Sequence, residues 1–403
     1  MNGGEIMNRE DFPMLRNDLI YFDNGATTLK PQCVIDEISN YYENYSANAH
    51  RGDYDISRKV DELYEETRDD VKTFINASKR EEIIFTKGTT ESMNMIIFGF
   101  MKNYLQKDDE VLITKTEHAS NVLPWYTLEK EIGIKVKFIP LEDYEVTIDN
   151  VKKSINDKTK VISLAWVTNT IGDIRPIKEI TKVAHDNNIL MVVDGAQSVP
   201  HFKTDVLDTD IDFLAFSAHK MLGPTGVGVL YGKKDYLEQM LPLNYGGGMN
   251  SFFESDKSLE YKPLPYRLEA GTMNISGILA FRKALSYLNE IGMDKVTNYE
   301  YELKNYLVKR LREIDNIEVY NENTKSGIVL FNIKNIFSED TSQYLNHYHV
   351  CVRAGNHCAK MVKDELIIKN TCRISLYFYN TKEEIDKFIK IMKGNKDIFK
   401  VII

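Results

Sequence analysis

Asp194 and Lys220 lie where an α/β protein presents its reactive side chains. Asp194 ends the apolar segment Ile189–Asp194, and Lys220 follows the apolar segment Phe213–Ser217 and precedes a Gly-Pro turn. Ligands of open α/β sheets bind at the carboxyl ends of the strands. A lysine that forms a Schiff base and a carboxylate that pairs with a pyridinium nitrogen are the two groups that pyridoxal 5'-phosphate (PLP) requires. A turn Asp and a solvent-exposed Lys are the alternatives for each residue taken alone.

The phosphate of such a cofactor needs hydrogen-bond donors near the same strand ends. The segment Lys87-Gly-Thr-Thr-Glu91 lies between a strand-like and a helical segment, so it offers the hydroxyls of Thr89 and Thr90 and backbone N–H groups at a helix start. Such a site binds phosphate. Ser217 and His219, close to the lysine, add two further donors. A helix cap is the alternative interpretation of the Gly-Thr-Thr turn.

Three further residues are suited to chemistry on an amino acid. His118 follows a strand-like segment, where an imidazole can stack on a flat ring and move protons. Cys358, in Arg353-Ala-Gly-Asn-His-Cys-Ala359, has Arg and His neighbours that favour the reactive thiolate. Arg373 opens a strand-like segment, and an arginine binds a carboxylate in a bidentate pair. The ordinary alternatives are a core or surface His, an inert Cys and a surface ion pair.

Strands and helices that alternate along the first part of the chain must position these residues. Helical patterns occur at Glu91–Leu105, Val122–Ile132 and Ile177–Asn187. The alternation predicts βαβ units and a mostly parallel sheet that is buried on both faces. Apolar, β-branched segments predict strands at Glu82–Thr86, Glu110–Thr114, Lys135–Ile139, Lys160–Val167, Ile189–Asp194, Phe213–Ser217 and Val227–Tyr231.

After the Gly-rich, aromatic region Tyr245–Gly271 the pattern changes. It becomes a mixture of long amphipathic helices and short strands, which is typical of an α+β unit. We therefore expect a large α/β domain over residues 20–265 and a smaller α+β domain formed by residues 1–19 and 266–403. Helices are expected at Ile275–Glu290, Met293–Glu313, Thr341–His347 and Lys382–Lys393, and strands at Ile317–Tyr320 and Gly327–Ile333.

The composition excludes several classes of protein. The 403 residues are 43% hydrophobic and 28% charged with a formal net charge of −9, which argues against non-specific nucleic-acid binding. The apolar runs are too short to cross a membrane and no signal peptide is visible, so a cytoplasmic location is expected. Four cysteines are too few for a disulfide scaffold and favour a reducing compartment. The adjacent His357 and Cys358 do not supply a tetrahedral ligand set, so no metal site is expected.

Taken together and in this order, these residues resemble a known family. The chain is similar to the group II (SufS-like) cysteine desulfurases, a branch of the class-V aminotransferase-fold PLP enzymes. The resemblance runs from Tyr21-Phe-Asp-Asn-Gly-Ala-Thr-Thr28 to Arg373-Ile-Ser-Leu-Tyr-Phe-Tyr-Asn-Thr381. It implies the PLP-dependent transferase fold type I, which is aspartate aminotransferase-like. The most specific segments are Val193-Asp-Gly-Ala-Gln197, Ser217-Ala-His-Lys-Met-Leu-Gly-Pro-Thr-Gly226, Glu269-Ala-Gly-Thr272 and Arg353-Ala-Gly-Asn-His-Cys358.

The resemblance also implies roles for individual residues. Lys220 would bind PLP covalently, Asp194 would pair with the pyridinium nitrogen and His118 would stack on the ring. Thr272 would reach the phosphate of the neighbouring subunit, which implies a homodimer. The remaining implied contacts are Gln197 and Asn169 at the phenolic side of the ring, Thr89, Thr90, Ser217 and His219 at the phosphate, and Arg373, Arg353, His50 and Arg51 around the substrate.

The implied reaction converts L-cysteine to L-alanine. Lys220, released from the cofactor, would remove the Cα proton, and Cys358 would attack the substrate sulfur and become a persulfide for iron–sulfur cluster assembly or other sulfur delivery. Selenocysteine lyase and cysteine sulfinate lyase are the alternatives on the same fold, and for them Cys358 could be dispensable. A non-catalytic sulfur-relay scaffold is the alternative from another class, and an absence of PLP on the purified protein would favour it.

Several positions depart from the family pattern and leave the sulfur acceptor open between a SufE-like and a SufU-like protein. Some members carry His-Pro-His-Asp where this chain has Phe337-Ser-Glu-Asp340, and one of those histidines helps to dock the acceptor in the zinc-dependent system. The core catalytic residues are unchanged. The other departures are Tyr54 for His, Lys87 for Arg, Asn356 for His and Lys360-Met361 for Gln-Pro.

Overall fold

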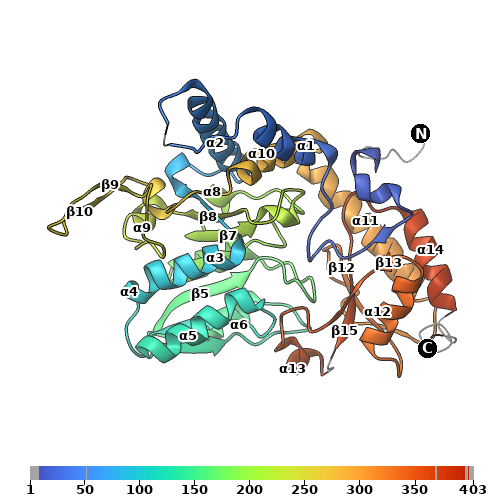
Figure 1. The fold of residues 1–403 in the computed structure, drawn as a ribbon. Helices are drawn as coiled ribbons and strands as arrows, with labels where there is room; N and C mark the ends of the chain where they lie inside the picture. Colours follow the sequence, from blue (N-terminus) through green and yellow to red (C-terminus); the bar gives the residue numbers. More distant parts are fainter. Residues whose placement is uncertain (1–8, 51, 368–369, 395–397, 399–403) are drawn as a thin grey trace.

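A seven-stranded sheet forms the centre of the larger part of the chain in the computed structural model, which describes residues 9–50, 52–367, 370–394 and 398 (Figure 1). The strand order is β2-β8-β7-β6-β5-β3-β4. Strands β3 to β7 run parallel to one another, whereas β8 is antiparallel to both β7 and β2. The bounds are β2 Ile83–Thr86, β3 Glu110–Ile113, β4 Lys135–Phe138, β5 Thr159–Ala165, β6 Leu190–Asp194, β7 Phe213–Ser217 and β8 Gly228–Gly232.

Both faces of this sheet are covered along β2, β3 and β5 to β8, because alternate residues of these strands pack into different hydrophobic clusters, whereas the edge strand β4 is mostly exposed. Met191 and Val193 of β6 belong to one cluster, and Leu190 and Val192 belong to another. The first cluster joins the sheet to α2 (Asp55–Phe74), α7 (Ile177–His185) and α10 (Ile275–Ile291). The second joins it to α5 (Leu123–Ile132) and the π-helical segment Met95–Met101. The result is the three-layer α/β arrangement expected from apolar, β-branched strands.

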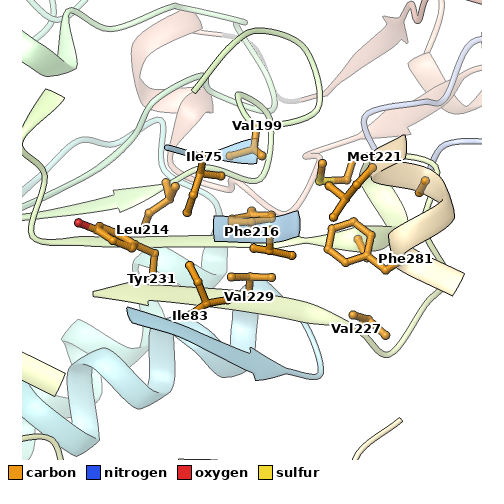
Figure 2. Close-up of a cluster of buried hydrophobic side chains, with 14 of the residues drawn as sticks. Ile75, Ile83, Val199, Leu214, Phe216, Met221, Val227, Val229, Tyr231 and Phe281 are labelled. Atoms are coloured by element: carbon orange, nitrogen blue, oxygen red, sulfur yellow. The ribbon is translucent and has the colours of Figure 1, made fainter. Parts of the chain in front are cut away.

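Figure 2 shows the first of these clusters from close by. Side chains from β7 and β8 meet residues from helices and turns that lie far away in the sequence, such as Ile75 and Phe281. Met221 and Val227 of the same cluster flank the turn that follows Lys220. Because a close-packed core transmits strain and resists movement, this packing fixes the position of the turn.

The helices of this part of the chain agree with the expected segments and add several more. The expected helix Glu91–Leu105 is helical from Thr89 to Tyr104, and its middle, Met95–Met101, is a π-helix. The bounds are α1 Gln32–Asn44, α2 Asp55–Phe74, α3 Thr89–Asn94, α4 Lys102–Tyr104, α5 Leu123–Ile132, α6 Ile148–Ser154, α7 Ile177–His185, α8 Val206–Thr209, α9 Lys234–Leu237 and α10 Ile275–Ile291.

A second sheet, with the order β11-β12-β15-β14, is antiparallel throughout. It packs with α11, α12 and α14 around its own hydrophobic cluster (Figure 1). The N-terminal strand β1 (Ile20–Tyr21) pairs in parallel with β13 (Val350–Cys351) beside it. The bounds are α11 Met293–Leu311, β11 Ile317–Val319, β12 Ile328–Ile333, α12 Ser338–His347, β14 Arg353–Gly355, α13 Val362–Leu366, β15 Thr371–Ser375 and α14 Lys382–Lys393.

The Gly-rich, aromatic region Tyr245–Gly271, which lies between the two sheets in the sequence, contains a hairpin. Its strands are β9 (Asn250–Phe253) and β10 (Leu259–Tyr261), and it projects from the body of the molecule (Figure 1). Phe253 near its tip is 72% exposed. Among the described residues, no helix has the length and apolar character needed to cross a membrane.

Candidate active site

A cavity of about 220 Å³ lies at the carboxyl ends of the central strands. It gathers eleven of the residues that the sequence singled out, from both halves of the chain. Strands β5, β6 and β7 end at this cavity, and β14 and β15 of the second sheet reach it from the other side. The eleven residues are Thr89, Thr90, His118, Asn169, Asp194, Gln197, Ser217, His219, Lys220, Arg353 and Arg373.

Lys220 and Asp194 are the charged pair at the bottom of this cavity. Burial lowers the pKa of Lys220 to about 8, and the negative charge of Asp194 partly opposes that shift. Burial raises the pKa of Asp194 to about 6, while Lys220 and the N–H of Ala196, which donates to its Oδ1 at 2.9 Å, hold it down. Near neutral pH the lysine therefore has an accessible free amine and the aspartate stays ionised.

Hydrogen bonds from the N-terminal segment hold the turn that carries Lys220 in place. The carbonyl oxygen of His219 accepts hydrogen bonds from the backbone N–H and hydroxyl of Thr28 at 3.0 and 3.2 Å, and from the hydroxyl of Thr27 at 3.0 Å. Lys30 Nζ donates to the same oxygen at 3.0 Å. Burial lowers the pKa of Lys30 to about 7. Four donors on one carbonyl fix the peptide bond that precedes Lys220, and the sequence alone does not predict that residues 27–30 lie here.

Hydroxyl groups gather beside the start of α3. Thr89 Oγ1 lies 2.7 Å from Ser217 Oγ, which also accepts the Thr89 N–H at 2.8 Å. Thr90 Oγ1 lies 2.7 Å from Ser120 Oγ. Burial and the charges of Lys220 and Lys30 lower the pKa of His219. These groups offer hydrogen-bond donors next to cationic side chains, which is the environment that a phosphate group needs.

His118 is oriented by the turn that follows it. Its Nδ1 accepts the N–H of Ser120 at 3.1 Å, so the neutral ring carries its proton on Nε2. The preceding residue, Glu117, is fully buried and pairs with Arg175, and its Oε2 accepts the N–H of Ala165 at 2.8 Å. This buried pair ties the His118 turn to the end of β5. The sequence analysis missed both partners, because each is an unremarkable residue until the fold brings them together.

Asn169 and Gln197 are polar groups left partly unsatisfied in the cavity. Asn169 Nδ2 donates to the carbonyl of His357 at 2.7 Å and Gln197 Nε2 donates to that of Gly25 at 2.6 Å. The amide oxygens of both are buried and have no hydrogen-bond partner among the described residues. Because such atoms are costly when nothing pairs with them, they point to a polar ligand in this cavity.

Cys358 lies on a loop at the mouth of the cavity, and its side chain is exposed. Its carbonyl accepts the N–H of Ala119 at 2.8 Å, which ties the loop to the His118 turn. Both His357 and Cys358 adopt left-handed backbone conformations, with φ of 52° and 58°. Such strain in residues other than glycine persists only where surrounding contacts hold it. His357, the residue before it, lines the cavity, so the anchored loop holds the exposed thiol next to that cavity.

Arg373 is a buried cation that lines the same cavity as Lys220. It is 1% exposed, and its NH1 donates to the carbonyl of Asn169 at 2.7 Å. Its NH2 donates to Asp23 at 3.0 Å, and Arg353 also pairs with that carboxylate. Asp23 belongs to the first motif that carries the family resemblance, but only the fold shows which cations it meets.

Three of the expected site residues that the structure describes do not line this cavity in the single chain. Cys358 lies at its mouth, as described above. Thr272 is exposed and lines a separate cavity with Lys87. His50 lines another cavity and faces Asp61 and Glu65. Arg51 lies outside the described residues.

Acid should destabilise this site, because one buried and two half-buried histidines must lose a proton to fold. Burial and nearby cations lower the folded-state pKa of His118 and His219 to about 4 and that of His357 to about 3. The value in an unfolded chain is about 6.5. Below that pH the unfolded chain binds more protons, so the free energy of unfolding falls as the pH falls from about 6.5 toward 4. Asp194 opposes the trend, because its raised pKa makes the folded chain bind the extra proton.

The measurement is urea unfolding of cofactor-free protein at several pH values between 4.5 and 7. We expect His357→Gln to reduce the dependence of the unfolding free energy on pH, because one of the three titrating groups is removed. His347→Gln, at an exposed position, serves as the control and keeps the parent dependence. An unchanged dependence in the His357 variant would contradict the assignment.

Comparison with known proteins places this site in a family. The sequence profile of the aminotransferase class-V family matches residues 20–388. The chain belongs to the class-V aminotransferase family. Members similar to it include a probable cysteine desulfurase of Halalkalibacterium halodurans, 40% identical over 99% of both chains, and the cysteine desulfurase of Haloferax volcanii, 39% identical over 98% of this chain and 94% of that one.

Solved structures agree with this family. The apo cysteine desulfurase of Thermococcus onnurineus superposes with a TM-score of 0.92 at 36% identity over 96% of both chains. The cysteine desulfurase CsdA of Escherichia coli, in an S-sulfonic acid form, superposes with a TM-score of 0.91 at 30% identity over 98% of both chains. The resemblance and the type I fold expected from the sequence are confirmed, and PLP is the cofactor that this family indicates.

Proposed function

We propose that this chain is a PLP-dependent cysteine desulfurase of the group II, SufS-like type, which converts L-cysteine to L-alanine and takes the sulfur onto Cys358. The observation that carries the proposal is the anchored loop that presents an exposed Cys358 beside the cavity of Lys220 and Asp194. Relatives that are 38–40% identical over nearly the whole chain carry the names cysteine desulfurase and probable cysteine desulfurase, which supports the same activity here.

The residues of the cavity fit PLP. Lys220 would hold its aldehyde carbon, Asp194 its pyridinium nitrogen, and His118 would stack on the ring. When bound, PLP supplies an electron sink that stabilises negative charge at the substrate Cα. Asn169 and Gln197, whose buried amide oxygens have no partner among the described residues, would border the ring. The phosphate would be held by Thr89, Thr90, Ser217 and His219.

Two arginines and Lys220 would then act on the substrate. Arg373 would bind the α-carboxylate, with Arg353 beside it. The Lys220 amine would take the proton from Cα, and its pKa of about 8 suits a base that works near neutral pH.

Transfer of sulfur is a displacement at the substrate sulfur atom. The Cys358 thiolate attacks that atom, an S–S bond forms, and the C–S bond breaks. Its electron pair stays on the three-carbon fragment, which takes up a proton and leaves as alanine. Left-handed residues 357 and 358 turn the loop so that the thiol remains accessible to solvent, as later delivery of the sulfur requires.

The wider organisation is part of the proposal. Residues 20–265 would form the cofactor-binding domain and residues 1–19 and 266–403 the smaller domain, although residues 1–8 lie outside the described part. Thr272 is exposed and outside the cavity of its own chain, so it would reach the phosphate site of a second copy in a homodimer. His50 would lie near the substrate. Arg51 would accompany His50.

The sulfur would pass to a SufE-like or SufU-like acceptor protein for iron–sulfur cluster assembly in the cytoplasm. The segment Phe337-Ser-Glu-Asp340, which stands where some relatives carry His-Pro-His-Asp, contains neither histidine, and Phe337 is 78% exposed. The choice between the two types of acceptor therefore stays open.

The test is alanine formation from L-cysteine by the PLP-loaded protein, with a strong reductant present to clear the persulfide. Continuous alanine release together with sulfide would support the proposal. No alanine from protein that holds PLP would overturn it, and selenocysteine and cysteine sulfinate would then be tried as substrates.

A further inference from the structure

The substrate side of the cavity contains two arginines that face each other across a sheet. Arg353 of β14 and Arg373 of β15 are direct partners in the antiparallel register. Like charges at such a position repel each other. Arg373 is almost completely buried, so its charge is poorly screened by solvent. The fold must supply a counter-charge for the pair to persist.

That counter-charge is Asp23, from the loop that follows β1. One of its oxygens accepts from Arg373 NH2 at 3.0 Å, and the other accepts from Arg353 Nε at 3.3 Å. Its side chain is only 18% exposed, and its backbone forms a bridge with Ser375 at the end of β15. A single carboxylate, fixed by the backbone, is thus shared between two guanidinium groups.

The shared carboxylate leaves donors free for one more anion. Arg373 has an unused hydrogen on each terminal nitrogen, because NH1 pairs with the Asn169 carbonyl and NH2 with Asp23. Its Nε is buried and has no partner in the described part of the chain. The charges of Arg353, Arg373 and Asp23 add to +1, so one substrate carboxylate brings the group to neutrality.

We propose that Asp23 is a specificity-determining positioning residue that limits the arginine pair to substrates with a single carboxylate. This inference rests on the proposed function for the identity of the substrate as an amino acid. With Asp23 present, the first carboxylate brings the net charge of the group to zero, so a second anionic group on the substrate gains no net attraction from it. With a neutral residue at position 23, a charge of +1 remains after the first carboxylate binds, and a second anion is attracted.

The experiment compares Asp23→Asn with the parent, both loaded with PLP, using propionate and succinate as probes that lack an amine. Binding is measured by the rise in the thermal unfolding midpoint with probe concentration. We expect the parent to bind succinate no better than propionate. In the variant, the ratio of succinate affinity to propionate affinity should be about tenfold higher than in the parent. Asp18→Asn is the matched control, because Asp18 is an exposed aspartate of the same N-terminal segment.

Arg353→Gln gives an independent check that does not depend on the Asp23 variant folding. It removes one positive charge while Asp23 stays, so propionate binding should weaken by about tenfold. Arg353 is 39% exposed in its side chain, and its loss leaves the buried Arg373–Asp23 pair intact. Equal propionate binding in this variant, or equal selectivity in Asp23→Asn, would overturn the inference.

The inference and the proposed function fail in different ways. If the parent releases no alanine from L-cysteine but Asp23→Asn still gains succinate binding, the substrate assignment is wrong and the charge rule stands. If the parent forms alanine and the Asp23 variant keeps the parent's selectivity, the function stands and the role of Asp23 is wrong.

Discussion

Replacing Lys220 with alanine is expected to abolish both covalent attachment of PLP and turnover of L-cysteine. The amine is at once the proposed attachment point of the cofactor and the base for the Cα proton, so both functions disappear together. We expect the rate of alanine formation to fall by about 10⁴-fold or more. Borohydride reduction followed by intact-protein mass measurement reports attachment, and alanine formation reports turnover.

The structure predicts that this variant folds normally. The turn that carries Lys220 is held by hydrogen bonds from Thr27, Thr28 and Lys30 to the His219 carbonyl. The Lys220 side chain takes no part in these hydrogen bonds. Lys203→Ala, at an exposed lysine of the same half of the chain, is the matched control and should keep the parent rate. A Lys220 variant that still forms alanine at the parent rate would rule out its role as base.

The location of the site could be predicted from the sequence because its main residues sit directly after buried strands. Asp194 ends β6, Lys220 follows β7 within one short turn, and Thr89 begins the helix after β2. A parallel sheet brings such strand ends to one edge, so the spacing along the chain is enough to predict proximity in space.

Residues that act through contacts between distant segments could not be predicted in this way. Asp23 meets its two arginines across more than 300 residues of sequence, and Lys30 reaches the His219 carbonyl across 189. Neither contact leaves a periodic pattern, because each comes from an irregular segment. Glu117 and Arg175 also come from irregular segments, so their pair is visible only in the folded structure.

The unusual backbone conformation of two segments also could not be predicted from the sequence. The π-helical turn at Met95–Met101 has the apolar pattern of an ordinary helix, and nothing in the side chains signals the wider turn. Left-handed His357 and Cys358 are likewise unusual, because neither is glycine. Their conformation depends on the bonds from Ala119 and Asn169, which come from other elements.

Cys358→Ala should stop alanine formation from L-cysteine while leaving the cofactor in place. Without the thiol, nothing in the cavity attacks the substrate sulfur, and the C–S bond has no acceptor for its sulfur atom. We expect the steady rate to fall on the order of 10³-fold, with PLP content and L-cysteine binding unchanged. In the parent, a short reaction without reductant should add the mass of one sulfur atom to the protein, and the variant should show no such increase.

Cys33→Ala is the matched control, because Cys33 is also exposed but lies on α1, outside the residues that line the cavity. It should keep the parent rate and still gain the sulfur atom. A Cys358 variant that releases alanine at the parent rate would show that the sulfur leaves without a protein nucleophile, as a selenocysteine or sulfinate lyase would allow. The strained, anchored loop would then need another purpose, whereas a loss confined to the Cys358 variant ties its conformation directly to sulfur transfer.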